Sequence, residues 1–187
     1  MGYAVQHLVS VLLADGVIEK SERDIYEYGL DLALYTFLSI GAIIVGGAIF
    51  GHATLVTGWI LTFSLLQGYC GGYHAKTHAR CFCVMVCAGT LAIVAWYYIP
   101  MAMYVPLTAI SGIVIGIIAP VEHVNAPMST NKKKRLTKND RMLVAVLFLI
   151  ALLIRSRLSI LAAGISLGMI SSAVSILYAT ISHKCLV

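Results

Sequence analysis

Charged side chains are scarce in this sequence. Only 11% of its 187 residues are Asp, Glu, Lys or Arg, whereas about 25% is ordinary for a soluble protein. Apolar residues make up 60%, against roughly 45–50% in soluble domains. A soluble core of this length cannot bury so much apolar surface, so the composition excludes a soluble protein and predicts that lipid surrounds most of the chain. We expect a single membrane-embedded domain over residues 1–187.

The apolar residues are grouped into runs that suit membrane helices. A helix needs about 20 mostly apolar residues to cross the hydrocarbon core. We therefore predict an all-α polytopic membrane protein with about six transmembrane helices between residues 30 and 181, at 30–50, 53–69, 82–98, 101–119, 142–154 and 158–181. The fifth run is short and is closed by Arg155 and Arg157, whose long side chains can reach the membrane surface.

Residues 1–29 are predicted to form an N-terminal interfacial segment. Its apolar residues recur at helical spacing, which is typical of an amphipathic helix on the membrane surface; they are Val5, Leu8, Val9, Leu12 and Leu13. The alternative is a helix that packs on the protein's own loops.

Basic residues predict the orientation, because cytoplasmic loops carry an excess of Lys and Arg. They gather in the N-terminal segment, in the 70–80 and 120–141 connections and in the tail. Placing all four inside leaves only Arg155 and Arg157 of the 13 basic residues outside. We expect a multi-pass protein of the cell membrane with both termini in the cytoplasm and 120–141 as a basic cytoplasmic loop.

Two further absences limit the function. The chain has no internal repeat of fixed period, which argues against an inverted-repeat transporter. The predicted spans also nearly lack ionisable residues, which argues against an ion-coupled carrier. A small exporter that passes a peptide without cleaving it, or a membrane adaptor, stays open as an alternative.

Small residues predict how the helices pack. The pairs Gly112/Gly116 and Gly164/Gly168 each form a Gly-x-x-x-Gly face, which allows close helix contact. We expect these faces to hold helices together within one chain, with a homodimer contact as the alternative use.

Reactive side chains are concentrated in residues 66–83, which contain two His, three Cys, a Lys and an Arg. A nucleophilic cysteine needs a thiolate, and Cys81 follows Arg80 at a predicted helix start, where negative charge is favoured. His78 is three residues away and would share a helix face with Cys81. His74 lies seven residues away, about 10.5 Å along an unbroken helix, so the chain between the two residues must leave the helical path. Gly71–Gly72 and the polar Lys76–Thr77 pair favour a bent connection. The residues alone leave the base undecided.

This segment has two other interpretations. His74, His78 and Cys81 could hold a zinc ion, but no carboxylate stands beside them for general-base work. The segment could also be an interfacial loop without chemistry. The remaining cysteines are predicted to be small buried hydrophobes without disulfides, because the cysteines cluster at the reducing face; they are Cys70, Cys83, Cys87 and Cys185.

The segment Gly71-Gly72-Tyr73-His74-Ala75, followed by Cys81, resembles the accessory gene regulator protein B family of membrane endopeptidases in Gram-positive quorum sensing. The family pattern Gly-x-His-Ala...Cys has the same order and spacing. Similar pieces at residues 25–30 and 119–127 extend the resemblance along most of the chain.

The resemblance implies that Cys81 is the nucleophile and His74 the base. We expect His78, Gly71, Gly72 and Gln67 to lie beside them as candidate supporting residues. It departs from the family at Gln67, where an Arg is common, and at Ala126, where a Lys is common.

By the same resemblance, the enzyme cleaves a short pro-peptide at the cytoplasmic face, and an acyl-enzyme then yields a cyclic thiolactone or lactone. Four basic residues could attract an acidic tail of that precursor, or could instead bind anionic lipid; they are Lys132, Lys133, Lys134 and Arg135. We expect the bilayer and the pro-peptide as partners, with no cofactor, metal or nucleic acid.

Overall fold

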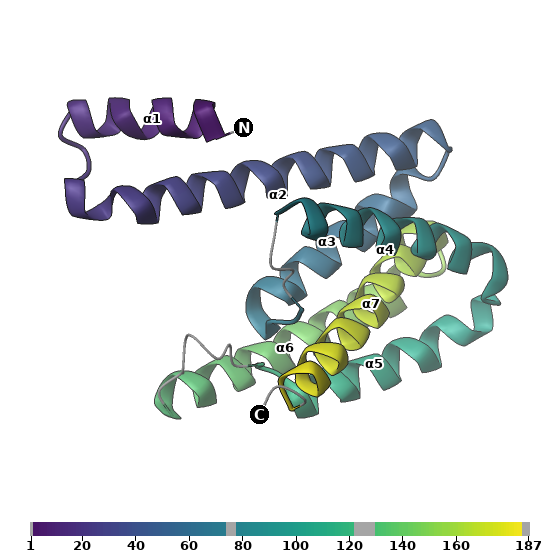
Figure 1. Cartoon of the computed structure of the whole chain (residues 1–187). Coiled ribbons are helices and arrows are strands. Elements are labelled where there is room, and N and C mark those ends of the chain that lie inside the picture. Colours follow the sequence, from purple (N-terminus) through teal and green to yellow (C-terminus); the bar gives the residue numbers. More distant parts are fainter. Residues whose placement is uncertain (1, 74–77, 122–129, 185–187) are drawn as a thin grey trace.

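The computed structural model describes residues 2–73, 78–121 and 130–184 (Figure 1). Within these ranges every regular element is a helix. The α-helices are α1 (Gly2–Ala14), α2 (Arg23–Ile49), α3 (Ala53–Cys70), α4 (His78–Tyr98), α5 (Tyr104–Ile118), α6 (Thr130–Ile154) and α7 (Ser159–Lys184), with short 3-10 helices η1 (Lys20–Glu22) and η2 (Met101–Met103).

Five helical segments are long and apolar enough to cross a membrane. They are Lys20–Ile49, Ala53–Cys70, Arg80–Tyr98, Met101–Ile118 and Ser159–Ser182. The predicted all-α, multi-pass membrane class is thereby confirmed for these five spans. The sixth predicted span, at 142–154, forms the second half of α6 and stays a prediction, because its apolar part is short.

The basic residues at 132–141 lie on the first turns of α6 and not in a loop. Lys and Arg are good helix formers, and the stretch from Thr130 to Arg141 contains neither Gly nor Pro. The part of the predicted 120–141 loop that lies before α6 falls, apart from Pro120 and Val121, outside the described residues.

Helices α3 and α7 form the centre of the bundle. Half of the apolar stretch of α3 and 61% of that of α7 are buried, against 11% for α4. Main chain meets main chain here, since a Cβ on Gly164 would overlap the Leu55 carbonyl oxygen and one on Gly168 would lie 2.8 Å from the Trp59 carbonyl oxygen. The Gly164/Gly168 face therefore packs within one chain, as predicted.

The second glycine pair also packs inside the chain. A Cβ on Gly112 of α5 would lie 3.1 Å from a methyl group of Val144 on α6, and one on Gly116 would lie 3.8 Å from the Arg141 side chain. These contacts join α5 to α6, which in turn contacts α7. The homodimer alternative stays untested.

The predicted N-terminal helix is confirmed as α1, which folds back along α2 (Figure 1). Val5 and Val9 are buried in a small cluster with Ile18, against which Leu30 and Leu34 of α2 pack. This part of the apolar face therefore meets the protein's own α2, while Leu8 and Val11 are exposed.

Candidate functional site

The connection between α3 and α4 begins with a sharp change of chain direction. Helix α3 ends at Cys70, and Gly71 follows with φ +73°, a left-handed conformation that favours glycine. The Val121 N–H donates to the Cys70 carbonyl oxygen at 3.0 Å, and a Cβ on Gly71 would lie 3.0 Å from the Val121 carbonyl oxygen. The chain thus leaves the helical path at residues 71–73, which we call the 71–73 turn. The predicted bend between His74 and Cys81 stays a prediction, because residues 74–77 lie outside the described residues.

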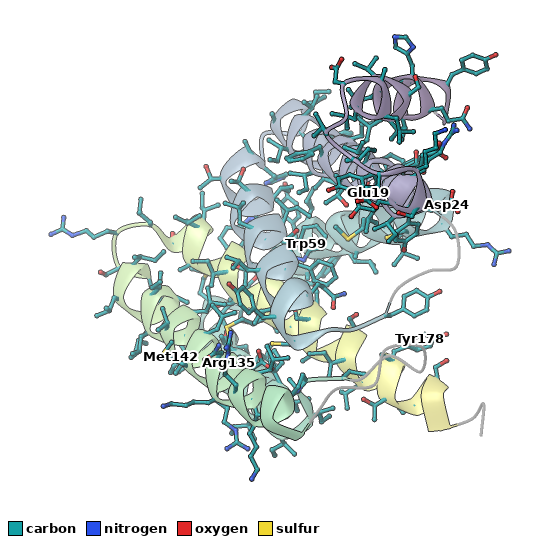
Figure 2. The ribbon with its side chains drawn as sticks, turned by 90° about the vertical axis from the view of Figure 1, so that its left-hand side faces the viewer. Glu19, Asp24, Trp59, Arg135, Met142 and Tyr178 are labelled. Atoms are coloured by element: carbon teal, nitrogen blue, oxygen red, sulfur yellow. The ribbon has the colours of Figure 1, made fainter. Side chains whose placement is uncertain are left out.

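Helix α7 contacts the 71–73 turn through one hydroxyl group and one aromatic ring. The Ser175 Oγ accepts hydrogen bonds from the Gln67 side-chain amide at 2.8 Å and from the Tyr73 main-chain N–H at 3.0 Å. The Tyr73 ring also meets the Tyr178 ring edge-on, with centroids 5.1 Å apart. Figure 2 shows Trp59 in the interior of the bundle and Tyr178 nearer the C-terminal end of α7.

There is little free space around this hydroxyl group. A Cβ on Gly72 would overlap the Gln67 side-chain oxygen and would lie 2.9 Å from the Ser175 Oγ. Gly72 therefore lets the main chain pass directly against both side chains. Gln67, predicted as a supporting residue, takes part in this network through its amide group.

Cys81 lies in the first turn of α4, directly after Arg80. The helix begins at His78, so the first helical turn contains both His78 and Cys81. The Cys81 side chain is half-buried, and Arg80 is exposed. His74 and the side chain of His78 lie outside the described residues, so the choice of base and the zinc alternative stay untested.

The other cysteines differ from the prediction that all are buried. Cys70 is buried, as predicted, whereas Cys83 and Cys87 are exposed. For these two the prediction is wrong, because α4 lies at the edge of the bundle and turns much of its surface outward. Cys185 lies outside the described residues.

Asp140 on α6 is a fully buried carboxyl group beside Cys70. Among the described residues, neither of its oxygens has a hydrogen-bond partner of ordinary geometry, and the Cys70 thiol is its polar neighbour. Asp140 precedes the apolar stretch of α6. Burial raises its pKa to about 6, a rise that the thiol contact opposes.

The basic residues at the start of α6 differ in their surroundings. Lys134 and Arg135 are exposed, which leaves them accessible to lipid or to an acidic peptide. The side chains of Lys132 and Lys133 lie outside the described residues. Further along the helix, Arg141 donates from its Nε to the Gly116 carbonyl oxygen of α5 at 3.0 Å.

Comparison with known proteins decides the family. The sequence profile described as Accessory gene regulator B matches residues 5–178. The chain belongs to this family. It is 26% identical over 158 residues to "Putative AgrB-like protein 2" of Clostridium perfringens strain 13, which covers 75% of this chain and 72% of that protein. It is 25% identical over 143 residues to "Putative AgrB-like protein" of strain SM101, covering 70% and 65%. No solved structure matches.

Membership of the accessory gene regulator B family supports a role in the accessory gene regulator quorum-sensing system. The structure adds two polar residues near the motif that sequence reasoning missed, Ser175 and Asp140. A sequence signal existed for Asp140, which is a lone acidic residue between a basic run and an apolar run. Ser175 is one of several serines on α7, and the sequence does not indicate which of them reaches the turn.

Proposed function

We propose that this member of the accessory gene regulator B family is a membrane cysteine endopeptidase. It cleaves a short quorum-sensing pro-peptide at the cytoplasmic face and produces the precursor of a cyclic thiolactone or lactone signal. Cys81 is the nucleophile and His74 the base, as the family motif implies.

The observation that carries this proposal is the position of Cys81 in the first turn of α4. The unpaired N–H groups of a helix start carry partial positive charge, which favours a thiolate. Arg80 adds a formal positive charge next to it in the chain. The half-buried side chain is shielded in part from water while remaining within reach of a substrate.

The reaction begins when the His74 imidazole takes the proton from the Cys81 thiol. The thiolate attacks the carbonyl carbon of the scissile peptide bond, and the imidazolium returns the proton to the leaving amine. An acyl-thioester on Cys81 remains. A thiol or hydroxyl within the bound peptide then attacks this thioester, its proton passes through His74 to the departing Cys81 sulfur, and the ring closes.

Ring closure requires that water does not reach the thioester first. Holding the internal nucleophile against the acyl group favours the intramolecular reaction, and a site at the end of lipid-embedded helices limits the access of water. The exposed Lys134 and Arg135 offer positive charge for an acidic tail of the precursor, which would place the peptide at the basic, cytoplasmic end.

The proposal is tested with a tagged precursor peptide that has an amphipathic helix and an acidic tail. It is co-expressed with the wild type and with Cys81→Ala, His74→Ala and His78→Ala, and cleavage is followed by mass spectrometry. Cys81→Ala and His74→Ala are expected to lower cleavage by at least about 100-fold, whereas His78→Ala retains most of it. Cys83→Ala is the matched control for loss of a thiol.

Cleavage that persists in Cys81→Ala would remove the nucleophile assignment. Equal losses in both His variants would leave the base unassigned. Cleavage that a chelator stops would favour the zinc alternative, and export of an uncut peptide would favour a transporter.

A further inference from the structure

The Ser175 hydroxyl accepts hydrogen bonds from two donors, one in helix α3 and one in the connection that follows it. Gln67 lies in the last turns of α3, and Tyr73 lies beyond the end of that helix. Both donate to the same oxygen, at 2.8 and 3.0 Å. The Ser175 oxygen on α7 therefore joins the end of α3 to the main chain that follows the two glycines.

The Ser175 oxygen restrains the main chain directly after two glycines. Glycine has the widest choice of backbone conformations, and two glycines in succession leave the direction of the following chain poorly defined. The hydrogen bond to the Tyr73 N–H fixes that direction at the residue that is covalently bonded to His74. Because Gly72 lies directly against Gln67 and Ser175, a small displacement of either side chain reaches the main chain.

We propose that Ser175 is a positioning residue for the reaction, acting through the Tyr73 main chain to set the direction in which the chain enters His74. This inference rests on the proposed function, in which His74 is the base. In this role Ser175 contacts neither the substrate nor the reacting sulfur. Its role is to keep the base in a productive geometry, on which the rate of proton transfer depends.

The alternative is that Ser175 only joins α3 to α7, and the chain contains a matched example of such a bond. One helical turn earlier, Ser171 accepts a hydrogen bond from the Trp59 indole N–H at 3.0 Å. That bond also links α3 to α7, but neither of its partners belongs to the 71–73 turn. Comparing Ser175→Ala with Ser171→Ala therefore separates a positioning role from general helix association.

The experiment measures kcat and KM for cleavage of the tagged precursor by the full chain in lipid nanodiscs. Ser175→Ala is expected to lower kcat by about 10- to 100-fold with KM changed less than about threefold, since a misplaced base slows chemistry more than binding. Ser171→Ala is expected to change kcat by less than about threefold. The midpoints of thermal unfolding should fall by similar amounts in both.

A second pair of variants keeps the test decisive if Ser175→Ala folds poorly. Thr and Val have nearly the same shape, and only Thr carries a hydroxyl group. Ser175→Thr is expected to recover most of the wild-type kcat relative to Ser175→Val. Equal kcat values for this pair, or equal losses in Ser175→Ala and Ser171→Ala, would overturn the positioning role.

The same measurements separate this failure from failure of the proposed function. Cys81→Ala is assayed beside the Ser175 variants. If Cys81→Ala is inactive while Ser175→Ala behaves like Ser171→Ala, the proposed function stands and the positioning role falls. If Cys81→Ala still cleaves, both fall.

Discussion

Along the contact between α3 and α7, the two main chains touch in one half and are bridged by side chains in the other. In the first, which we call the glycine half, Gly164 and Gly168 lie against the main chain at Leu55 and Trp59. In the second, the serine half, Ser175 receives hydrogen bonds from Gln67 and Tyr73. One helix pair therefore uses two kinds of contact within a few turns.

The two kinds of contact have different roles: one stabilises the bundle, and the other orients the 71–73 turn. Close main-chain approach gains dispersion energy from many atoms and needs only the absence of side chains on α7. A hydrogen bond between membrane helices contributes only about 0.6–2 kcal/mol, but it fixes the positions of particular atoms. The glycine half is thus suited to holding the bundle together, and the serine half to orienting the turn that leads to the motif.

The largest effect on stability is expected from Gly164→Ala, in the glycine half. The new Cβ would overlap the Leu55 carbonyl oxygen and lie 3.1 Å from the Trp59 nitrogen. Because these are main-chain atoms, α3 and α7 must move apart, and we expect a loss of about 3 kcal/mol, at the upper end for overpacking. The measurement is thermal unfolding in detergent micelles.

The control for this prediction is Gly41→Ala on α2, where a Cβ meets no atom within 4 Å. It should leave the unfolding midpoint unchanged or raise it, since Ala favours a helix more than Gly does. If the two variants unfolded at the same temperature, the glycine half would not be the main source of stability.

The helices of this bundle could be predicted from the apolar runs and the helical spacing of the sequence, except for the start of α6. Long apolar runs fixed five spans because lipid excludes unpaired main-chain groups and so favours helices. The start of α6 differs from the prediction because a basic run indicates both a cytoplasmic loop and a helix, and Lys132 and its neighbours are good helix formers. The exposure of Cys83 and Cys87 differs from the prediction because the sequence does not reveal that α4 lies at the edge of the bundle.

The motif residues of the site could also be predicted from the sequence. Ser175, which contacts the turn from a distant part of the chain, could not. Gly71, Gly72 and Cys81 lie at a turn and at a helix start, both local features with local signals. Ser175 reaches the turn from more than 100 positions away. Its neighbours Ser171 and Ser172 are chemically identical, and only the packing of α7 on α3 selects one of the three.

The second-largest effect on stability is expected at Asp140, the buried carboxyl group beside Cys70 at the end of α3. At pH 7.5 a buried Asp140 carboxylate without a donor of ordinary geometry among the described residues opposes folding. Asp140→Asn removes the charge at nearly constant shape. We expect it to raise stability by about 1–2 kcal/mol at pH 7.5, which is less than the full effect of the shift because the Asn amide must also leave water.

The pH dependence gives the sign of this effect. The pKa of Asp140 is raised from 3.8 to about 6, so the folded chain holds this proton more tightly than the unfolded chain. Stability of the wild type then falls as pH rises from about 4 through 6, and its difference from Asp140→Asn should vanish near pH 4. Asp24→Asn, an exposed position on α2, is the control. A loss of stability in Asp140→Asn at pH 7.5 would contradict the prediction and indicate a stabilising partner for the charge.

The smallest effect is expected from Tyr178→Leu, which removes the edge-on ring contact to Tyr73. An aromatic pair of this kind contributes about 0.5–1.5 kcal/mol, and Tyr178 is 56% exposed, so we expect about 0.5 kcal/mol and less than about a threefold change in cleavage. Tyr178→Phe keeps the ring and should match the wild type in both unfolding and cleavage assays. If Tyr178→Leu slowed cleavage as much as Ser175→Ala, the Tyr73 ring rather than its main-chain N–H would be the group that orients the turn. The serine half would then owe its directing role to aromatic packing on α7, since the hydroxyl of Ser175 is unchanged in this variant.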